Sequence, residues 1–205
     1  MATLVKFCGF TRPADMEWAL AHGVDAVGVV VEPSSPRFQG PDSDIWSVFR
    51  AATAQRVLVF GHFAPERMAD CDVVQAVDIP NHTLAAERWW AVRPSTLLEG
   101  WEGQAAQVQR VLVDALAPGA YGGTGHRVDP EEFLAVRAQS PVPCILAGGL
   151  NPDNVYDVVR ILRPVMVDLA SGIEFEPGKK DPAKMQAFLD ALRAADRARN
   201  DDEHC

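Results

Sequence analysis

The sequence predicts a single parallel (β/α)₈ barrel, the TIM-barrel architecture. Strand-like and helix-like segments alternate about eight times, and no linker divides the 205 residues. The strand-like runs are apolar throughout, as expected of parallel strands that are buried on both faces. An open doubly wound sheet would place a G-x-G-x-x-G motif after the first strand, where this chain has C-G-F-T.

The composition is ordinary for a globular domain and disfavours several classes of function. Hydrophobic residues make up 48% of the chain and charged residues 23%. A net charge of −9 argues against a nucleic-acid partner. Because no apolar run is long enough to span a bilayer and the N-terminus lacks a signal-peptide pattern, we expect a cytoplasmic protein without a membrane partner. The cysteines (Cys8, Cys71, Cys144 and Cys205) lack metal-site spacing, which predicts reduced thiols and no bound metal.

In the first half of the chain, apolar runs bounded by turn residues predict four strands. We expect them at residues 4–7, 26–31, 56–60 and 73–77. Thr11 is expected to cap a first helix, which has Pro13 in its first turn and stops near Gly23. A second helix carries apolar residues at Ile45, Val48, Phe49 and Ala52. A short third helix is expected around residues 65–69.

Four more strands are predicted in the second half, at residues 89–92, 111–113, 144–146 and 165–169. The fifth strand lies in a stretch that is hard to assign, with a short helix before it and a poor helix from Ser95 after it. A helix is expected from Pro130 to about Gln139, and another begins with Asn151 as its cap and Pro152 at its first position.

The last helix carries Met185, Phe188, Leu189 and Leu192 at helical spacing. The polar residues after it resemble a frayed end. We therefore expect the barrel domain over residues 1–198 and a frayed tail over residues 199–205.

Small residues after the last two strands indicate a phosphate site. Gly148 and Gly149 follow the seventh strand, and Ser171 and Gly172 follow the eighth. Backbone N–H groups at glycine turns bind phosphate, and (β/α)₈ barrels often use the loops after strands 7 and 8 for this purpose. One such pair would be explained by a simple turn, whereas two in tandem favour a phosphorylated ligand.

Three further residues near strand ends are candidates for chemistry at the mouth of the barrel. Cys8 follows the first strand and Asp114 the sixth, a placement that suits proton removal at one atom and delivery at another. A cysteine base needs a cationic neighbour, and an aspartic acid needs a raised pKa. The alternatives are a buried apolar Cys8 and an Asp114 that binds loop amides. Arg37 is either a carboxylate-binding group or a solvated surface arginine.

Five blocks of sequence, in order along nearly the whole chain, match the pattern of a known family. They are K-F-C-G-F-T-R-P-A-D, G-V-D-A-V-G-V-V-V-E-P-S-S-P-R, V-L-V-D with Y-G-G-T-G, A-G-G-L-N-P-D-N-V and V-D-L-A-S-G-I-E-F-E-P-G-K-K-D. Together they resemble the phosphoribosylanthranilate isomerase family of tryptophan biosynthesis. The resemblance implies a (β/α)₈ barrel without metal or organic cofactor. It also implies an isomerase that converts N-(5′-phosphoribosyl)anthranilate to its 1-deoxyribulose 5-phosphate product by an Amadori rearrangement. We expect a monomer or a homodimer whose partner is a small phosphorylated sugar.

The resemblance also implies roles for individual residues. Cys8 resembles the general base that removes the C2′ proton, and Asp114 resembles the general acid that protonates the ring oxygen. Arg37 resembles the contact to the anthranilate carboxylate, and Gln75 and Asp168 are further substrate-binding positions. The residues that resemble the phosphate grip are Gly148, Gly149, Ser171 and Gly172.

The chain departs from the family in the part of the pocket that is expected to be aromatic. Val77 stands where the family has a histidine, Val128-Asp129-Pro130 replace F-D-W, and Ala170 replaces a serine. His62 lies on the third strand, so one hypothesis is that it replaces the lost histidine. The alternative is that His62 faces the helices and the pocket is simply apolar. Two other functions stay open: isomerisation of a different N-ribosyl phosphate, and binding of a sugar phosphate without turnover.

Overall fold

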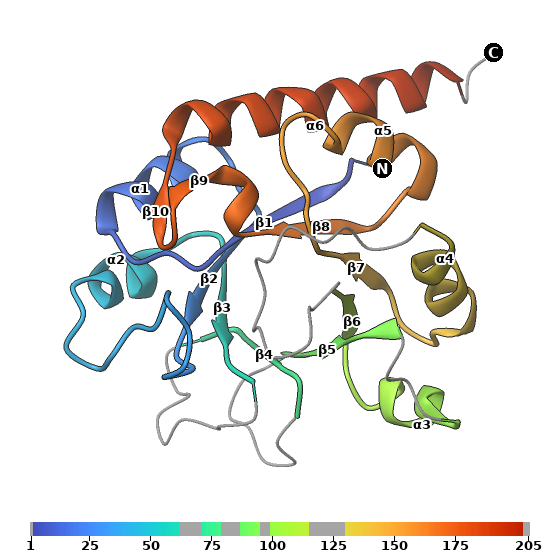
Figure 1. Cartoon of the computed structure of the whole chain (residues 1–205), viewed down its shortest axis with the longest axis horizontal. Helices are drawn as coiled ribbons and strands as arrows, with labels where there is room; N and C mark the ends of the chain where they lie inside the picture. Colours follow the sequence, from blue (N-terminus) through green and yellow to red (C-terminus); the bar gives the residue numbers. More distant parts are fainter. Residues whose placement is uncertain (1, 62–70, 79–86, 95–98, 115–129, 203–205) are drawn as a thin grey trace.

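The computed structural model describes residues 2–61, 71–78, 87–94, 99–114 and 130–202. Eight parallel strands form a closed barrel in sequence order, and β8 pairs with β1 to complete it (Figure 1). The strands are β1 (Leu4–Cys8), β2 (Ala26–Val30), β3 (Gln55–Val59), β4 (Val73–Ala76), β5 (Glu87–Val92), β6 (Arg110–Val113), β7 (Cys144–Leu146) and β8 (Met166–Leu169). The predicted fold class is therefore confirmed.

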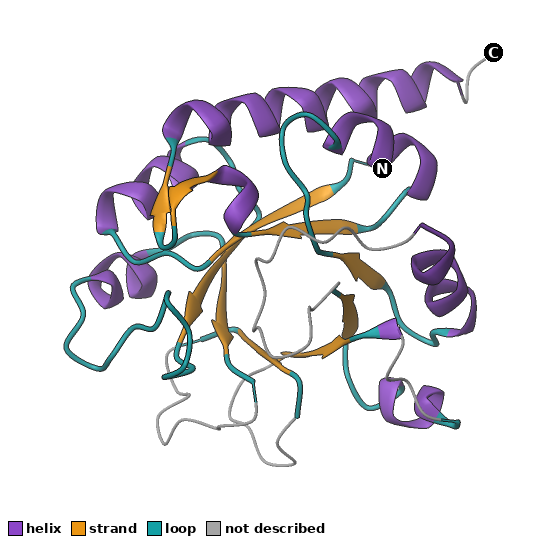
Figure 2. Cartoon of the chain, viewed as in Figure 1, coloured by secondary structure: helices purple, strands orange, loops and turns teal. Residues whose placement is uncertain are grey.

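Helices surround the barrel, and the long C-terminal helix lies across one side next to α5 and the N-terminus (Figure 2). The helices are α1 (Pro13–Ala21), α2 (Ile45–Ala51), α3 (Trp101–Ala105), α4 (Pro130–Gln139), α5 (Val155–Leu162) and α6 (Pro182–Asp202). Asp196 of α6 accepts hydrogen bonds from the backbone N–H and the hydroxyl of Thr3, both at 2.8 Å, which ties α6 to the start of β1.

Successive residues of each strand point alternately to the helices and to the barrel interior. On β6, Val111 and Val113 pack in the core between strands and helices, whereas Leu112 belongs to the smaller core inside the barrel. On β1, Val5 and Phe7 belong to the outer core. Lys6 and Cys8 therefore face the interior, which places an ionisable side chain and a thiol on the inner wall.

Of the two predicted helix caps, the one at Thr11 is wrong. The residue before α1 is Arg12, and the hydroxyl of Thr11 instead donates to the carbonyl oxygen of Gly178 at 2.5 Å. The predicted cap of the helix after β7 is present: the side chain of Asn151 accepts hydrogen bonds from the N–H groups of Asp153 and Asn154, and its carbonyl oxygen accepts one from Val155, where α5 begins.

Residues after β8 form two elements that the sequence did not predict. A short 3₁₀ helix, η2 (Ser171–Ile173), leads into a hairpin of β9 (Glu174–Glu176) and β10 (Lys179–Lys180). Alternation is hard to detect over strands this short and this polar. The hairpin carries the charged residues that support the site described below.

The last helix is longer than predicted. It continues through Asp202, into the segment that was expected to fray, and the buried Arg199 forms a salt bridge with Asp196 at 3.0 Å. The domain boundary itself stays a prediction. The helices expected around residues 65–69 and just before β5, and the first residues of the helix expected from Ser95, lie outside the described residues.

Candidate active site

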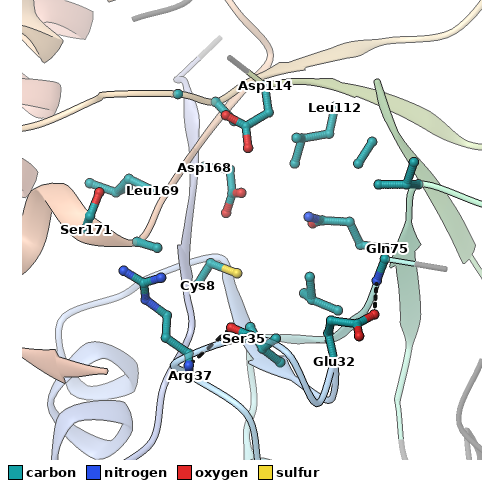
Figure 3. Close-up of a pocket in the computed structure, with 18 of the residues that line it drawn as sticks. Cys8, Glu32, Ser35, Arg37, Gln75, Leu112, Asp114, Asp168, Leu169 and Ser171 are labelled. Atoms are coloured by element: carbon teal, nitrogen blue, oxygen red, sulfur yellow. Dashed lines mark hydrogen bonds between the residues drawn. The ribbon is translucent and has the colours of Figure 1, made fainter. Parts of the chain in front are cut away.

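A cavity opens at the carboxyl ends of the strands and is lined by residues at or just after the ends of strands all around the barrel (Figure 3). Every residue that the sequence predicted for the site lines it: Cys8, Arg37, Gln75, Asp114, Gly148, Gly149, Asp168, Ser171 and Gly172. The fold thus brings the predicted residues into one place, while their roles stay predictions.

Cys8 lies at the end of β1 with its thiol directed into the cavity (Figure 3). Its partner on β2 is Gly28. A Cβ atom at Gly28 would lie 2.8 Å from the Cys8 sulfur and 3.1 Å from Cε of Lys6. A side chain on β2 would therefore displace both groups, and glycine leaves the space that they occupy.

Lys6 and Asp168 form an ion pair inside the barrel, next to Cys8. Lys6 Nζ lies 2.7 Å from Asp168 Oδ1, and Lys6 is fully buried. Burial lowers the pKa of Lys6, but the negative charges of Asp168 and then Cys8 outweigh it, and the pKa ends above its ordinary value. Lys6 is therefore an ammonium ion at neutral pH.

This lysine is the cationic neighbour that a cysteine base requires, and the sequence interpretation did not single it out. Burial raises the pKa of the Cys8 thiol, the charge of Lys6 opposes that rise, and the charge of Asp168 adds to it. The net pKa lies above the ordinary value, so the resting form at neutral pH is the thiol. The signal in the sequence was the i, i+2 spacing of Lys6 and Cys8 on one strand, which puts them on the same face.

Arg37 is held in a buried charge network, so the alternative of a solvated arginine is wrong. Its Nε and Nη2 atoms donate to the two carboxylate oxygens of Glu174 at 2.9 and 2.6 Å, and its side chain is only 7% exposed. Burial alone would raise the pKa of Glu174, but the hydrogen bonds from Arg37 and the charge of Lys180 bring it below its ordinary value. The expected contact between Arg37 and a substrate carboxylate stays a prediction.

Lys180 joins this network to two strand ends. Its fully buried ammonium group lies 2.8 Å from Glu174 and donates to the carbonyl oxygens of Cys8 at 2.6 Å and Ala170 at 3.1 Å. Burial lowers the pKa of Lys180, and the charge of Glu174 opposes that shift. One hairpin side chain therefore fixes the ends of β1 and β8 relative to Arg37.

The two glycine loops that are expected to bind phosphate pack against each other. Gly148 and Gly149 have φ angles of 94° and 63°, a region that side chains disfavour. Asn154 Nδ2 donates to the carbonyl oxygen of Gly149 at 2.9 Å, which braces the first loop. A Cβ atom at Gly172 would lie 1.8 Å from the carbonyl oxygen of Leu150, so only glycine allows this approach.

Replacing Gly172 with alanine is expected to lower kcat/KM for a phosphorylated substrate by roughly 10- to 10²-fold, because the two loops must separate. Steady-state kinetics would measure this, and most of the loss is expected in KM. Gly103→Ala is the matched control, since a Cβ atom there meets nothing within 4 Å. A Gly172→Ala protein with unchanged KM would contradict the phosphate assignment.

The part of the cavity that departs from the family is only partly described. Val77 lines the cavity, and its carbonyl oxygen accepts a hydrogen bond from Trp90 Nε1 at 3.0 Å. His62, Val128 and Asp129 lie outside the described residues, so the proposed histidine replacement stays a prediction. Gln75 points into the cavity, and its buried Oε1 atom has no hydrogen-bond partner among the described residues.

Within the described part of the chain, no group of three or more histidine, cysteine, aspartate or glutamate side chains could hold a metal ion. None of the helices described there is long and apolar enough to cross a membrane.

The chain is similar to known proteins along nearly its whole length. Residues 93–191 match the family model described as N-(5′-phosphoribosyl)anthranilate (PRA) isomerase. The N-(5′-phosphoribosyl)anthranilate isomerase of Dechloromonas aromatica is 37% identical over 212 residues, which cover 96% of this chain and 99% of the relative. The N-(5′-phosphoribosyl)anthranilate isomerase of Ralstonia nicotianae is 36% identical, and the match covers 96% of this chain and 95% of the relative.

Solved structures of the same family are similar to this chain in fold. The phosphoribosyl anthranilate isomerase of Thermotoga maritima superposes with a TM-score of 0.75 at 30% identity, covering 94% of this chain and 99% of its own. Another phosphoribosyl anthranilate isomerase, in complex with reduced 1-(o-carboxyphenylamino)-1-deoxyribulose 5-phosphate, gives a TM-score of 0.71 at 27% identity with the same coverage. On the identity and coverage of these relatives, the chain belongs to the N-(5′-phosphoribosyl)anthranilate isomerase family.

Proposed function

We propose that this chain converts N-(5′-phosphoribosyl)anthranilate to its 1-deoxyribulose 5-phosphate product, with Cys8 as general base and Asp114 as general acid. The observation that carries the proposal is that a thiol and a carboxyl group line the same cavity as two interlocked glycine loops. The loops supply an anion site. The two titratable groups lie beside it, at the carboxyl ends of β1 and β6.

The first step opens the sugar ring. Asp114 gives its proton to the ring oxygen, the C1′–O4′ bond breaks, and the nitrogen lone pair forms a C=N double bond. Asp114 must start protonated for this step, because only the protonated carboxyl group can give a proton to the ring oxygen. Leu112 and Ala147 supply apolar walls of the cavity.

The second step moves the double bond. The Cys8 thiolate takes the proton from C2′, the electrons of that C–H bond form the C1′=C2′ bond, and the C=N electrons return to nitrogen. The resulting enol-amine tautomerises to the ketone. No electrons enter or leave the substrate, so neither a redox cofactor nor a metal is required by this scheme.

The remaining cavity residues bind and orient the substrate. Gly148, Gly149, Ser171 and Gly172 hold the phosphate through backbone N–H groups. Arg37 binds the anthranilate carboxylate. Asp168 and Gln75 bind substrate from the inner wall. Oε1 of Gln75, for which no described residue is a hydrogen-bond partner, accepts a hydrogen bond from a donor on the substrate.

The decisive experiment has two arms. The gene should restore growth of a tryptophan auxotroph that lacks this isomerase, and the purified protein should turn over N-(5′-phosphoribosyl)anthranilate with activity that EDTA leaves unchanged. Failure of both arms in a folded protein would favour a different N-ribosyl phosphate, the alternative suggested by the departures at Val77 and Ala170. Binding of a sugar phosphate without turnover would instead indicate a non-catalytic barrel.

We also propose a cytoplasmic monomer or homodimer that acts on a small phosphorylated sugar. The phosphoribosylanthranilate isomerase of T. maritima is described as dimeric. Size-exclusion chromatography with light scattering would establish the state of this chain.

A further inference from the structure

The buried charged groups near Cys8 include more cations than carboxylates. Three buried cations, Lys6, Arg37 and Lys180, lie in networks with two buried carboxylates, Asp168 and Glu174. Glu174 binds both Arg37 and Lys180, and Asp168 binds Lys6. Among these five groups the cations outnumber the carboxylates by one, and a thiolate at Cys8 would balance their charges.

Of the three cations, Lys6 is the one whose side chain lies beside the side chain of Cys8. Lys6 and Cys8 are separated by one residue on the inner face of β1, and both side chains crowd the space left by Gly28. Lys180 reaches Cys8 at the backbone carbonyl rather than at the sulfur. Arg37 packs over Gly9 and donates to Glu174.

We propose that Lys6 is a positioning residue that stabilises and orients the Cys8 thiolate, while Asp168 limits how much of the lysine charge reaches the sulfur. The proposal rests on the proposed function, since it assigns Lys6 a task only if Cys8 acts as the base. The thiol proton leaves to water, the S–H bond electrons stay on sulfur, and Lys6 keeps its own proton throughout.

The signs of the expected effects follow from the charges. Removing the lysine charge takes away what stabilises the thiolate, so a smaller fraction of Cys8 is ionised at neutral pH. Removing the aspartate charge takes away a repulsive neighbour and has the opposite effect. Two substitutions of adjacent buried groups therefore move the ionisation of one thiol in opposite directions, which general loosening of the barrel would not do.

The test measures the rate at which iodoacetamide alkylates Cys8, followed by mass spectrometry of the Cys8 peptide as pH is varied. Lys6→Met should react about tenfold more slowly than wild type at neutral pH and equally fast at high pH, where the thiol is ionised in both proteins. Asp168→Asn should react faster than wild type at neutral pH. Equal rates for Lys6→Met and wild type across the pH range would overturn the proposal.

Lys6→Met leaves Asp168 buried without its partner, so the single variant risks unfolding. The comparison of Lys6→Met/Asp168→Asn with Asp168→Asn avoids this, because both proteins lack the buried carboxylate charge. The double variant should alkylate more slowly than Asp168→Asn at neutral pH. If these two react alike, Lys6 does not stabilise the thiolate.

Steady-state kinetics distinguish the role of Lys6 from the role of Cys8 as general base. kcat/KM of Lys6→Met should fall about tenfold at neutral pH and recover toward the wild-type value as pH rises, since alkaline solution ionises the thiol without help. Cys8→Ala should not recover at any pH. A fully active Cys8→Ala protein would reject the general-base assignment, whereas the alkylation rates would still show whether Lys6 controls the thiol.

Discussion

Cys8→Ala is expected to lower kcat by about 10²–10⁴-fold with a milder effect on KM, because the substitution removes a proton acceptor and leaves the binding loops in place. Asp114→Asn should lower kcat over the same range, since an amide cannot give a proton to the ring oxygen. Stopped-flow or steady-state assays on folded protein would measure both effects.

Cys144→Ala provides the matched control for the cysteine variant. Cys144 is also a buried thiol near a strand end, but it packs in the outer core between strands and helices rather than in the cavity. Its replacement should leave kcat unchanged and alter only stability. If Cys8→Ala keeps near wild-type turnover, the base must be sought elsewhere in the cavity.

The pH dependence of wild-type activity also tests the assignment of Cys8 as general base. Burial raises the pKa of Cys8, so the thiolate required for the second step becomes more abundant as pH rises from neutrality. kcat/KM should therefore increase with pH along the limb set by Cys8.

Glu174→Gln is expected to lower the free energy of unfolding by about 3–5 kcal/mol, because it leaves two buried cations without their common partner. Arg37 and Lys180 would lose the carboxylate that binds both, although the shape of the side chain is kept. Urea unfolding would measure the change. Activity should also fall, since Arg37 and the ends of β1 and β8 lose their shared anchor.

Glu176→Gln, in the same hairpin, is the control. Glu176 forms a salt bridge with Lys179 in which both side chains are 49% exposed, and such surface pairs contribute about 0–1 kcal/mol. A similar loss of stability in both variants would show that the hairpin itself, rather than the buried network, is sensitive to substitution.

The dependence of stability on pH provides a second test of the role of Glu174. Its pKa in the folded protein is below the ordinary glutamate value, so the folded state favours the ionised form. The stability gained is present above the unfolded-state pKa and is lost as pH falls through the folded-state pKa. The difference in unfolding free energy between wild type and Glu174→Gln should therefore narrow in acid.

The sequence by itself determined the barrel, the order of its strands and several of the residues at its mouth. Each of these depends on local patterns: apolar runs bounded by turns, helical spacing in segments such as α6, and the position of Cys8 and Asp114 directly at strand ends. Because the carboxyl ends of all parallel strands in a barrel meet at one face, a residue's place along its own strand was enough to assign it to the cavity.

Only the tertiary structure decided which charges meet around Cys8. Lys6 and Asp168 are 162 residues apart, Arg37 and Glu174 are 137 apart, and Lys180 reaches the carbonyl oxygen of Cys8 across 172 residues. Whether such groups touch depends on the register in which β8 closes on β1 and on a short hairpin whose polar sequence gives no periodic signal. A one-residue change in that register would turn Asp168 away from Lys6, because strand side chains alternate between faces.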